Sequence, residues 1–408
     1  MTLAKARAYH WEFTSRFRRG AFGWKSQPAT QRVGQAVSEI KKVAHGDPVL
    51  GAEGAVLFLA RVSPALERVD SSSGAIGTAV NHAIEELVAI IARAPADAKT
   101  REGWLERLWE AHANDEIPYI ERLGDFWGEL CASREIASAW ADRLVRMVEM
   151  SWSPDPELRG FFHGTTACLS ALLRAARYED ILALLENAPV VFWPYRQWGV
   201  RAFAALGRTE EAIHYAEESR GLNDSPVAIA RACEETLLAS GRLEEAYRCY
   251  ALEATRGTSY LATYRALASK YPQKGPEKLL GDLVASTPGD EGKWFATAKE
   301  VGLFDEAVRL ANRAPCDPRT LTRAARDFAD ERPEFAVKAG LAALRWLAEG
   351  YGYEITGADV WAAYANTVKA AEKAGRAGEV RDQIRTLVAS ETYGERFVTR
   401  ILGRELGP

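Results

Sequence analysis

Apolar residues along the first third of the chain recur at helical intervals. In residues 79–93, Val80, Ile84, Leu87 and Ile91 lie three or four positions apart, which places them on one face of an α-helix. Strand-like alternation is nearly absent, whereas the helix-favouring residues Ala, Leu, Glu and Arg dominate. The pattern predicts an all-α fold, with further helices at residues 28–44, 53–66, 104–112, 118–131 and 135–150.

Loop signals separate the predicted helices. Residues 70–77 are rich in Ser and Gly, a proline interrupts the pattern at 95–99, and residues 153–157 read SPDPE, which is a strong helix breaker. We place the main boundary at this last segment. The sequence then divides into a basic aromatic N-terminal segment (1–45), an N-terminal helical region (46–155) and a region of helical repeats (156–408).

An internal repeat occupies the C-terminal half. Residues 207–212 read GRTEEA and residues 241–246 read GRLEEA, and the glycines of the two copies are 34 residues apart. A glycine can adopt the left-handed conformation that ends a helix, and an acidic pair suits the positive end of the next one. Weaker copies begin at residues 176, 275, 302, 332 and 375.

This frame resembles the tetratricopeptide repeat, a helix pair of 34 residues whose second helix opens with a similar segment. The resemblance covers about residues 160–390 and is strong for two copies. It implies an α-solenoid of stacked antiparallel helix pairs, because one pair cannot bury its apolar face alone. HEAT-like pairs in residues 46–155 would extend the same stack, although no period is visible there.

Composition narrows the functional classes. Of 408 residues, 47% are hydrophobic and 26% are charged, which is an ordinary globular balance. The net charge of −4 argues against a surface that coats nucleic acid non-specifically. Five scattered cysteines without a CxxC pair fit a reducing compartment. The N-terminus does not resemble a signal peptide and no apolar run is long enough for a bilayer, so we expect a cytoplasmic protein without a membrane span.

Candidate chemistry is sparse. Zinc sites need three or four convergent ligands, and two histidine clusters at helical spacing each supply two at best, without a recognisable third. No nucleophile motif, phosphate loop or cofactor motif is present, so we expect neither metal nor cofactor and no catalytic residues. Solvated helix faces are the alternative interpretation of the two clusters, His82 with Glu85 and Glu86, and His112 with Asp115 and Glu116.

The N-terminal segment is strongly basic. Residues 1–45 contain nine Lys or Arg and two Glu, a net charge of +7, which leaves −11 for the rest. Basic residues can contact phosphates while aromatic rings stack on exposed bases. Alternatively, the segment is an amphipathic first helix that caps the repeats with its aromatics inward, or it docks to an acidic protein or membrane surface. The candidate nucleic-acid-binding residues are Arg16, Arg18, Arg19, Trp24 and Lys25.

The repeat frame favours a binding function. We expect a non-catalytic interaction scaffold that holds a protein or peptide partner on the concave side of a helical-repeat surface. First helices should supply that surface, with Tyr195, Arg196, Arg231 and Glu234 as candidate partner-binding residues. A nucleic-acid-binding helical-repeat protein that uses the basic segment is the alternative, and a helical-repeat enzyme is third.

Overall fold

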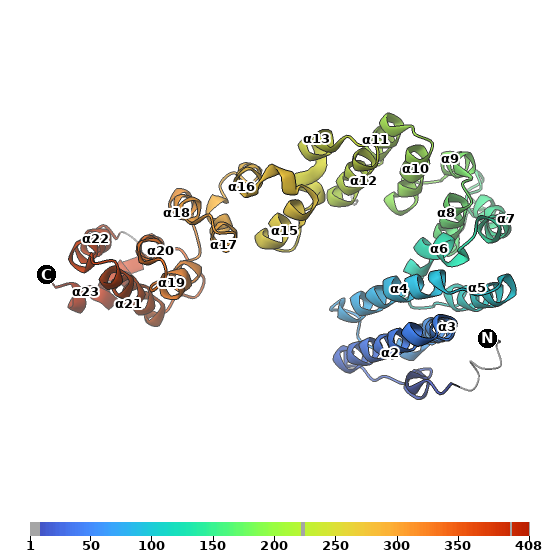
Figure 1. Cartoon of the computed structure of the whole chain (residues 1–408), viewed down its shortest axis with the longest axis horizontal. Coiled ribbons are helices and arrows are strands. Elements are labelled where there is room, and N and C mark those ends of the chain that lie inside the picture. Colours follow the sequence, from blue (N-terminus) through green and yellow to red (C-terminus); the bar gives the residue numbers. More distant parts are fainter. Residues whose placement is uncertain (1–8, 222–224, 392–393, 408) are drawn as a thin grey trace. The chain divides into compact units, whose positions relative to one another are not determined.

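Helices follow one another along the whole described chain (Figure 1). The computed structural model describes residues 9–221, 225–391 and 394–407, and no β-strand occurs within these ranges. Neighbouring helices pack against each other, which confirms the all-α prediction. The chain forms two compact units, residues 1–242 and 243–408. The loop at 153–157 therefore lies inside the first unit.

The first unit opens with long helices and continues with shorter ones. Five of its helices match the predicted ranges, with differences of up to six residues at an end. Its elements are η1 (Glu12–Ser15), α2 (Ser26–Gly46), α3 (Pro48–Leu66), α4 (Ala75–Arg93), α5 (Ala98–Ala113), η2 (Glu121–Phe126), α6 (Trp127–Cys131), α7 (Arg134–Ser151), α8 (Thr165–Arg174), α9 (Tyr178–Glu186), α10 (Trp193–Ala205), α11 (Thr209–Glu218) and α12 (Pro226–Ala239).

One predicted helix of this unit is shorter than expected. Residues 118–131 form the 3₁₀ turn η2 followed by the short helix α6, not a single helix. Gly124 in η2 lies so close to α8 that an added Cβ atom would overlap the Thr166 hydroxyl and come within 3.3 Å of the Ala167 nitrogen. A close approach between distant segments leaves no trace in hydrophobic spacing, so the periodicity could not show it.

The second unit consists of shorter helix pairs and a longer C-terminal group. Its first helix is continuous from α13 (Leu243–Ala246) through a π-helical turn, η3 (Tyr247–Ala251), to α14 (Leu252–Ala254). The other elements are α15 (Tyr260–Lys270), η4 (Pro272–Lys274), α16 (Pro276–Ala285), η5 (Glu291–Trp294), α17 (Phe295–Glu300), α18 (Phe304–Arg313), α19 (Pro318–Asp327), α20 (Pro333–Ala348), α21 (Gly357–Lys373), α22 (Ala377–Ala389), η6 (Gly394–Arg396) and α23 (Phe397–Leu406).

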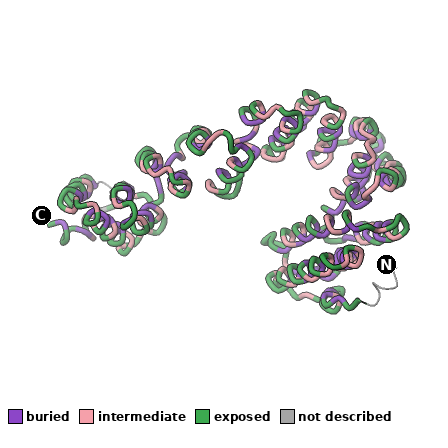
Figure 2. Tube along the Cα trace, in the orientation of Figure 1, coloured by how far each residue is buried: buried purple, intermediate pink, exposed green. Residues whose placement is uncertain are grey.

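Burial is concentrated on the inner faces of the packed helices (Figure 2). Two described helices, α3 and α4, are long and apolar enough to cross a membrane by length and composition alone. Both contribute side chains to the core of the first unit, and 61% of the most apolar stretch of α3 and 39% of that of α4 are buried. Core packing thus accounts for their apolar character, which is compatible with the predicted absence of a membrane span.

The predicted turn glycines have positive φ angles. Gly207, Gly241 and Gly275 have φ angles of +76°, +77° and +76°, and each stands directly before or close to the start of the following helix. Ala176 takes the equivalent place before α9 with φ +61°. The glycines relieve a strain that a side chain would cause at this backbone position.

Beside several of these turns, a basic residue forms an ion pair with an acidic residue of an earlier helix. Arg177 at the start of α9 pairs with Asp142 of α7 at 2.5 Å. It also pairs with Asp180 of its own helix at 2.6 Å. Ion pairs of the same kind recur within each unit: Arg242 with Glu210, Lys274 with Glu244, and Arg376 with Glu334. The recurrence gives alternate helices a common register.

Candidate binding groove

A groove in the second unit lies between α19 and α21, beside the loop that joins α20 to α21. Its volume is about 420 Å³, within the range of small-ligand and side-chain pockets. Polar, aromatic and apolar side chains all contribute to it. The lining consists of Asp317, Pro318, Arg319, Thr322, Arg323, Arg326, Leu347, Tyr353, Asp359, Ala362 and Asn366.

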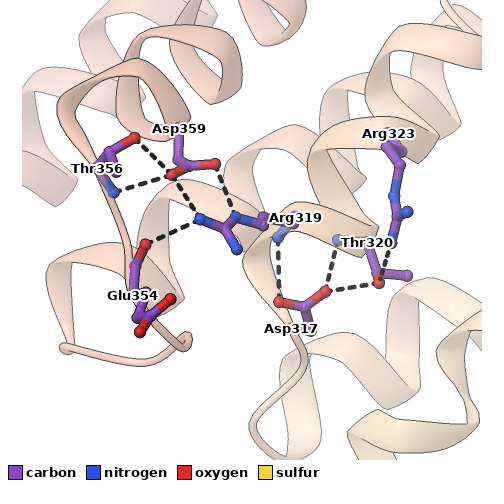
Figure 3. A network of polar contacts seen from close by, with 7 residues as sticks. All are labelled: Asp317, Arg319, Thr320, Arg323, Glu354, Thr356 and Asp359. Atoms are coloured by element: carbon purple, nitrogen blue, oxygen red, sulfur yellow. Dashed lines mark hydrogen bonds and ion pairs between the residues drawn. The ribbon is translucent and has the colours of Figure 1, made fainter.

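Local sequence signals begin both helices at this groove (Figure 3). Asp317 caps α19, since its carboxylate accepts the Thr320 backbone N–H at 2.9 Å and the Thr320 hydroxyl at 2.7 Å. At α21, Asp359 accepts the backbone N–H and the hydroxyl of Thr356, at 2.9 and 2.8 Å. These caps satisfy N–H groups that have no partner within their own helix.

Arg319 joins the two helix starts. Its guanidinium donates to both carboxylate oxygens of Asp359, at 2.8 and 3.0 Å, and to the Glu354 carbonyl oxygen at 2.9 Å (Figure 3). The hydrogen bond from Arg319 is the main reason that the pKa of Asp359 lies well below its usual range. A two-pronged contact of this kind fixes orientation as well as distance, so it sets the position of α21 against α19.

The loop between α20 and α21 presents a tyrosine at the groove. Gly350, Gly352 and Glu354 all have positive φ angles, of +84°, +110° and +46°. The hydrogen bond from Arg319 holds the third of these residues. Tyr353 lines the groove and is 80% exposed, so its ring is available to a bound chain.

Arg323 is the groove cation that a ligand can use most directly. It donates to the Thr320 hydroxyl at 3.0 Å, and no carboxylate within the described ranges forms an ion pair with it. Arg326 pairs with Asp327 at 2.7 Å, and Arg319 pairs with Asp359. The groove therefore combines an exposed phenol, the Asn366 amide and an apolar wall with a guanidinium that forms no direct ion pair among the described residues. This set suits an extended polypeptide with a carboxylate beside an apolar side chain.

The predicted partner-binding residues lie elsewhere, in the first unit. Tyr195 of α10 packs on Trp152 at 5.5 Å between ring centroids. The Arg196 guanidinium lies 3.5 Å from the Tyr215 ring centroid and donates to the Ser219 hydroxyl at 2.8 Å.

On α12, Arg231 is exposed and Glu234 is fully buried. The four predicted residues therefore do not face one described cavity together, and their role in partner binding stays a prediction. The groove residues could have been found from one signal. In PRTLTRAARD, Arg319, Arg323 and Arg326 recur at helical spacing and form a basic stripe.

The N-terminal segment is not the amphipathic helix that we expected as one alternative. In its described residues 9–25, the segment has only one helical element before α2, the 3₁₀ turn η1. Its aromatics nevertheless point inward, since Trp11, Phe13 and Phe17 are buried. Arg16, Arg18, Arg19, Trp24 and Lys25 are all exposed; Lys5 and Arg7 lie outside the described residues.

The histidine clusters have ordinary structural surroundings. His82 lies 3.6 Å from Glu85, which also pairs with Arg122, and Glu86 pairs with Lys41. In the second cluster, buried Asp115 accepts from the Ser63 hydroxyl and from the Ile120 backbone N–H. Across the described ranges, no three His, Cys, Asp or Glu side chains converge as a set of metal ligands.

His112 is buried between aromatic rings. Its Nε2 lies 3.3 Å from the Glu121 carbonyl oxygen, which can only accept, so Nε2 carries the proton. Its Nδ1 is buried without a hydrogen-bond partner. Burial therefore lowers the pKa of His112, with a further lowering by His163 and opposing effects of the Glu121 backbone and side chain.

We predict that this histidine makes stability depend on pH. With a folded pKa below 6.5, the stabilisation is fully present above pH 6.5 and is lost as pH falls, because the unfolded chain takes up the proton first. In His112→Phe, the slope of unfolding free energy against pH should decrease by up to about 1.4 kcal/mol per pH unit. Denaturant titrations at pH values from about 7.5 to 5 measure this slope. Identical slopes in the two proteins would contradict the assignment.

Comparisons with known proteins add no relative. No protein-family model matches the sequence, and no curated protein matches it significantly.

Proposed function

We propose that this protein is a non-catalytic interaction scaffold. In this proposal, tetratricopeptide-like helix pairs stack as an α-solenoid, with HEAT-like pairs in the N-terminal region. A protein or peptide partner binds to the surface formed by the first helices of the pairs. A cytoplasmic location goes with this proposal and follows from the sequence only.

Two features of the fold support stacking of repeated pairs. The turns with glycines of positive φ at 207, 241 and 275 recur at the period of the tetratricopeptide repeat. Ion pairs beside such turns connect the starts of α9, α16 and α22 to α7, α13 and α20, within single units. Exposed ion pairs contribute little stability individually, but repeated ones specify which surfaces meet. The first helices are then left to form the opposite, binding face.

The groove between α19 and α21 is the observation that carries the proposal. These helices are the first members of the pairs α19–α20 and α21–α22. Arg323 faces the groove and lacks a carboxylate partner among the described residues, while Arg319 and Asp359 hold the walls in place. A partner segment with an acidic side chain would supply the missing charge. Its apolar neighbour would cover Pro318 and Leu347.

Selection of displayed random peptides on the immobilised full chain tests the proposal. We expect enriched peptides to share an acidic residue next to an apolar one. Their affinity, measured by fluorescence polarisation, should fall at least about tenfold in Arg323→Glu, because a charged hydrogen bond is worth roughly 1.5–3 kcal/mol. The matched control is Lys338→Glu, a reversal at an exposed position of α20 outside the groove. Failure to enrich any peptide, or equal binding to both variants, would refute the groove as the site.

A further inference from the structure

A second exposed surface, on the first unit, is positively charged and is not part of the groove. It consists of the exposed residues Arg16, Arg18, Trp24 and Lys25 of the N-terminal segment, the half-buried Arg32 near the start of α2, and the exposed Arg68 just after α3. We call these six residues the basic patch. We propose that the basic patch binds single-stranded nucleic acid, with phosphates on its guanidinium groups and a base stacked on Trp24.

The patch is held on a rigid base. Trp11, Phe13 and Phe17 are buried against the first unit, and Phe13 and Phe17 make edge contacts with Phe58 of α3 at 5.6 and 5.0 Å between centroids. Gly54 of α3 lies directly under the Trp11 ring. The inward aromatics therefore fix the segment, and the alternating cations must face solvent. A pre-ordered surface loses less entropy when it binds a ligand.

Two arginines of the patch converge on a neutral group. The Gln35 side-chain oxygen accepts from Arg32 at 2.7 Å and from Arg16 at 3.3 Å. Two like charges thus lie side by side, and within the described ranges neither forms an ion pair with a carboxylate. Their repulsion is relieved when an anion binds between them, and a phosphate offers acceptor oxygens to both guanidinium groups.

The remaining cations extend the positive charge. Arg18 and Lys25 are exposed and have no carboxylate partner among the described residues. Arg68 lies against Gly20, beside Arg19. Glu67 is shared between Arg19 and Arg68, at 3.1 and 3.9 Å, so one carboxylate faces two guanidinium groups. The region keeps an excess of positive charge, although the whole chain is acidic.

The exposed ring of Trp24 favours single-stranded nucleic acid over a membrane surface or a duplex as the partner of the basic patch. Its side chain is 72% exposed, and its carbonyl oxygen accepts the Asp70 backbone N–H at 2.9 Å, which anchors the residue in place. A membrane surface would need several exposed apolar side chains here, but Trp11, Phe13 and Phe17 point inward. One exposed ring, next in sequence to Lys25 and in the same basic segment as Arg16 and Arg18, instead matches a surface that stacks a base and contacts the backbone beside it. Duplex nucleic acid would hide its base faces from this ring.

Fluorescence anisotropy with the full-length chain tests the inference. The probes are labelled oligo(dT) and oligo(U) of about 12 nucleotides, within the known range of single-strand site sizes, in about 50 mM NaCl. We expect binding that weakens with salt, with a slope of log K against log salt of about −2 to −3, since each neutralised phosphate contributes about −0.7. Trp24→Ala should weaken binding by roughly 5- to 150-fold, the equivalent of one lost stack.

Paired variants distinguish binding at the basic patch from a non-specific effect of the protein's overall charge. Arg16→Glu with Arg32→Glu should weaken binding more than tenfold, whereas Arg146→Glu, an exposed reversal on α7, should leave it unchanged. Trp361→Ala, at an exposed tryptophan of the second unit, is the control for Trp24. Circular dichroism of each variant verifies folding. No saturable binding to either oligonucleotide, equal loss in the control variants, or binding only to vesicles containing phosphatidylserine would overturn the proposal. The peptide groove is unaffected by any of these outcomes.

Discussion

Replacing Arg101 by methionine should lower the free energy of unfolding of the first unit by about 3 kcal/mol. Arg101 is 4% exposed and donates to three backbone carbonyl oxygens: Ile91 at 3.1 Å, Leu130 at 3.2 Å and Ala94 at 2.7 Å. These carbonyls close the C-terminal ends of α4 and α6. Methionine fills the space but removes three charge-assisted hydrogen bonds, worth roughly 1.5–3 kcal/mol each. The loss is partly offset because a buried charge is removed and because the Ile91 and Ala94 carbonyls keep backbone donors, the Ala94 and Ala96 N–H groups.

The measurement is denaturant unfolding followed by tryptophan fluorescence and circular dichroism. Burial lowers the pKa of Arg101, yet an arginine remains charged at any pH suitable for this experiment. The control is Arg134→Met, at the exposed first residue of α7, which we expect to change stability by no more than about 0.5 kcal/mol. If Arg101→Met behaved like this control, the three carbonyl contacts would not contribute to folding.

The second large effect concerns the contact between α20 and α21. A Cβ atom at Gly340 would overlap the hydroxyl of Thr367 and lie 2.9 Å from its Cβ. Thr367 is fully buried, and its hydroxyl donates to the Ala363 carbonyl oxygen at 2.6 Å, so it cannot rotate away freely. Gly340→Ala should therefore destabilise the second unit by about 1–3 kcal/mol, despite the better helix propensity of alanine.

Two companion variants make the reason testable. Gly340→Ala combined with Thr367→Gly should regain part of the loss, because the methyl group then faces a position without a side chain. Gly378→Ala in α22, where an added Cβ meets nothing within 4 Å, should instead stabilise by roughly 0.5–1 kcal/mol. Thermal unfolding of the full chain compares all of these proteins. Additive effects in the double variant would exclude the Gly340–Thr367 contact as the cause.

Gly340 also matters for the groove. The helix α21 carries Asp359, Ala362 and Asn366 on the groove side, and its distance from α20 depends on the missing side chain at Gly340. Peptide binding in Gly340→Ala should therefore weaken together with stability. By contrast, Arg323→Glu changes only the charge of the groove, so the two effects can be separated.

Local patterns in the sequence predicted many of the helices and turns. The apolar spacing in residues 79–93 predicted α4, and the GRxEEA segments predicted where Gly207 and Gly241 would turn the chain. These features depend on neighbours within about one helical turn, so they are visible without any tertiary contact. The 3₁₀ turn at Glu121–Phe126 could not be predicted from the sequence, because it depends on the close contact of Gly124 with α8, which is distant in sequence.

The candidate binding sites also combine features that the sequence shows locally with features that depend on long-range contacts. The basic stripe of Arg319, Arg323 and Arg326 is a local signal in one helix. Which of these arginines is available depends on residues far along the chain, since Asp359 engages Arg319 across 40 positions. Likewise, the outward-facing cations of the N-terminal segment follow from its alternating pattern, but Gln35 and Arg68 join them only in three dimensions.

By itself, the sequence determined the helical class, the turn positions and the segments in which positive charge gathers, because each follows from spacing along one element. Only the tertiary structure decided that Arg323 faces the groove without a direct ion pair among the described residues, that Arg16 and Arg32 meet at one amide, and that Arg101 closes two helix ends. The physical reason is that charge compensation and burial depend on distances between elements, and these distances are set by packing.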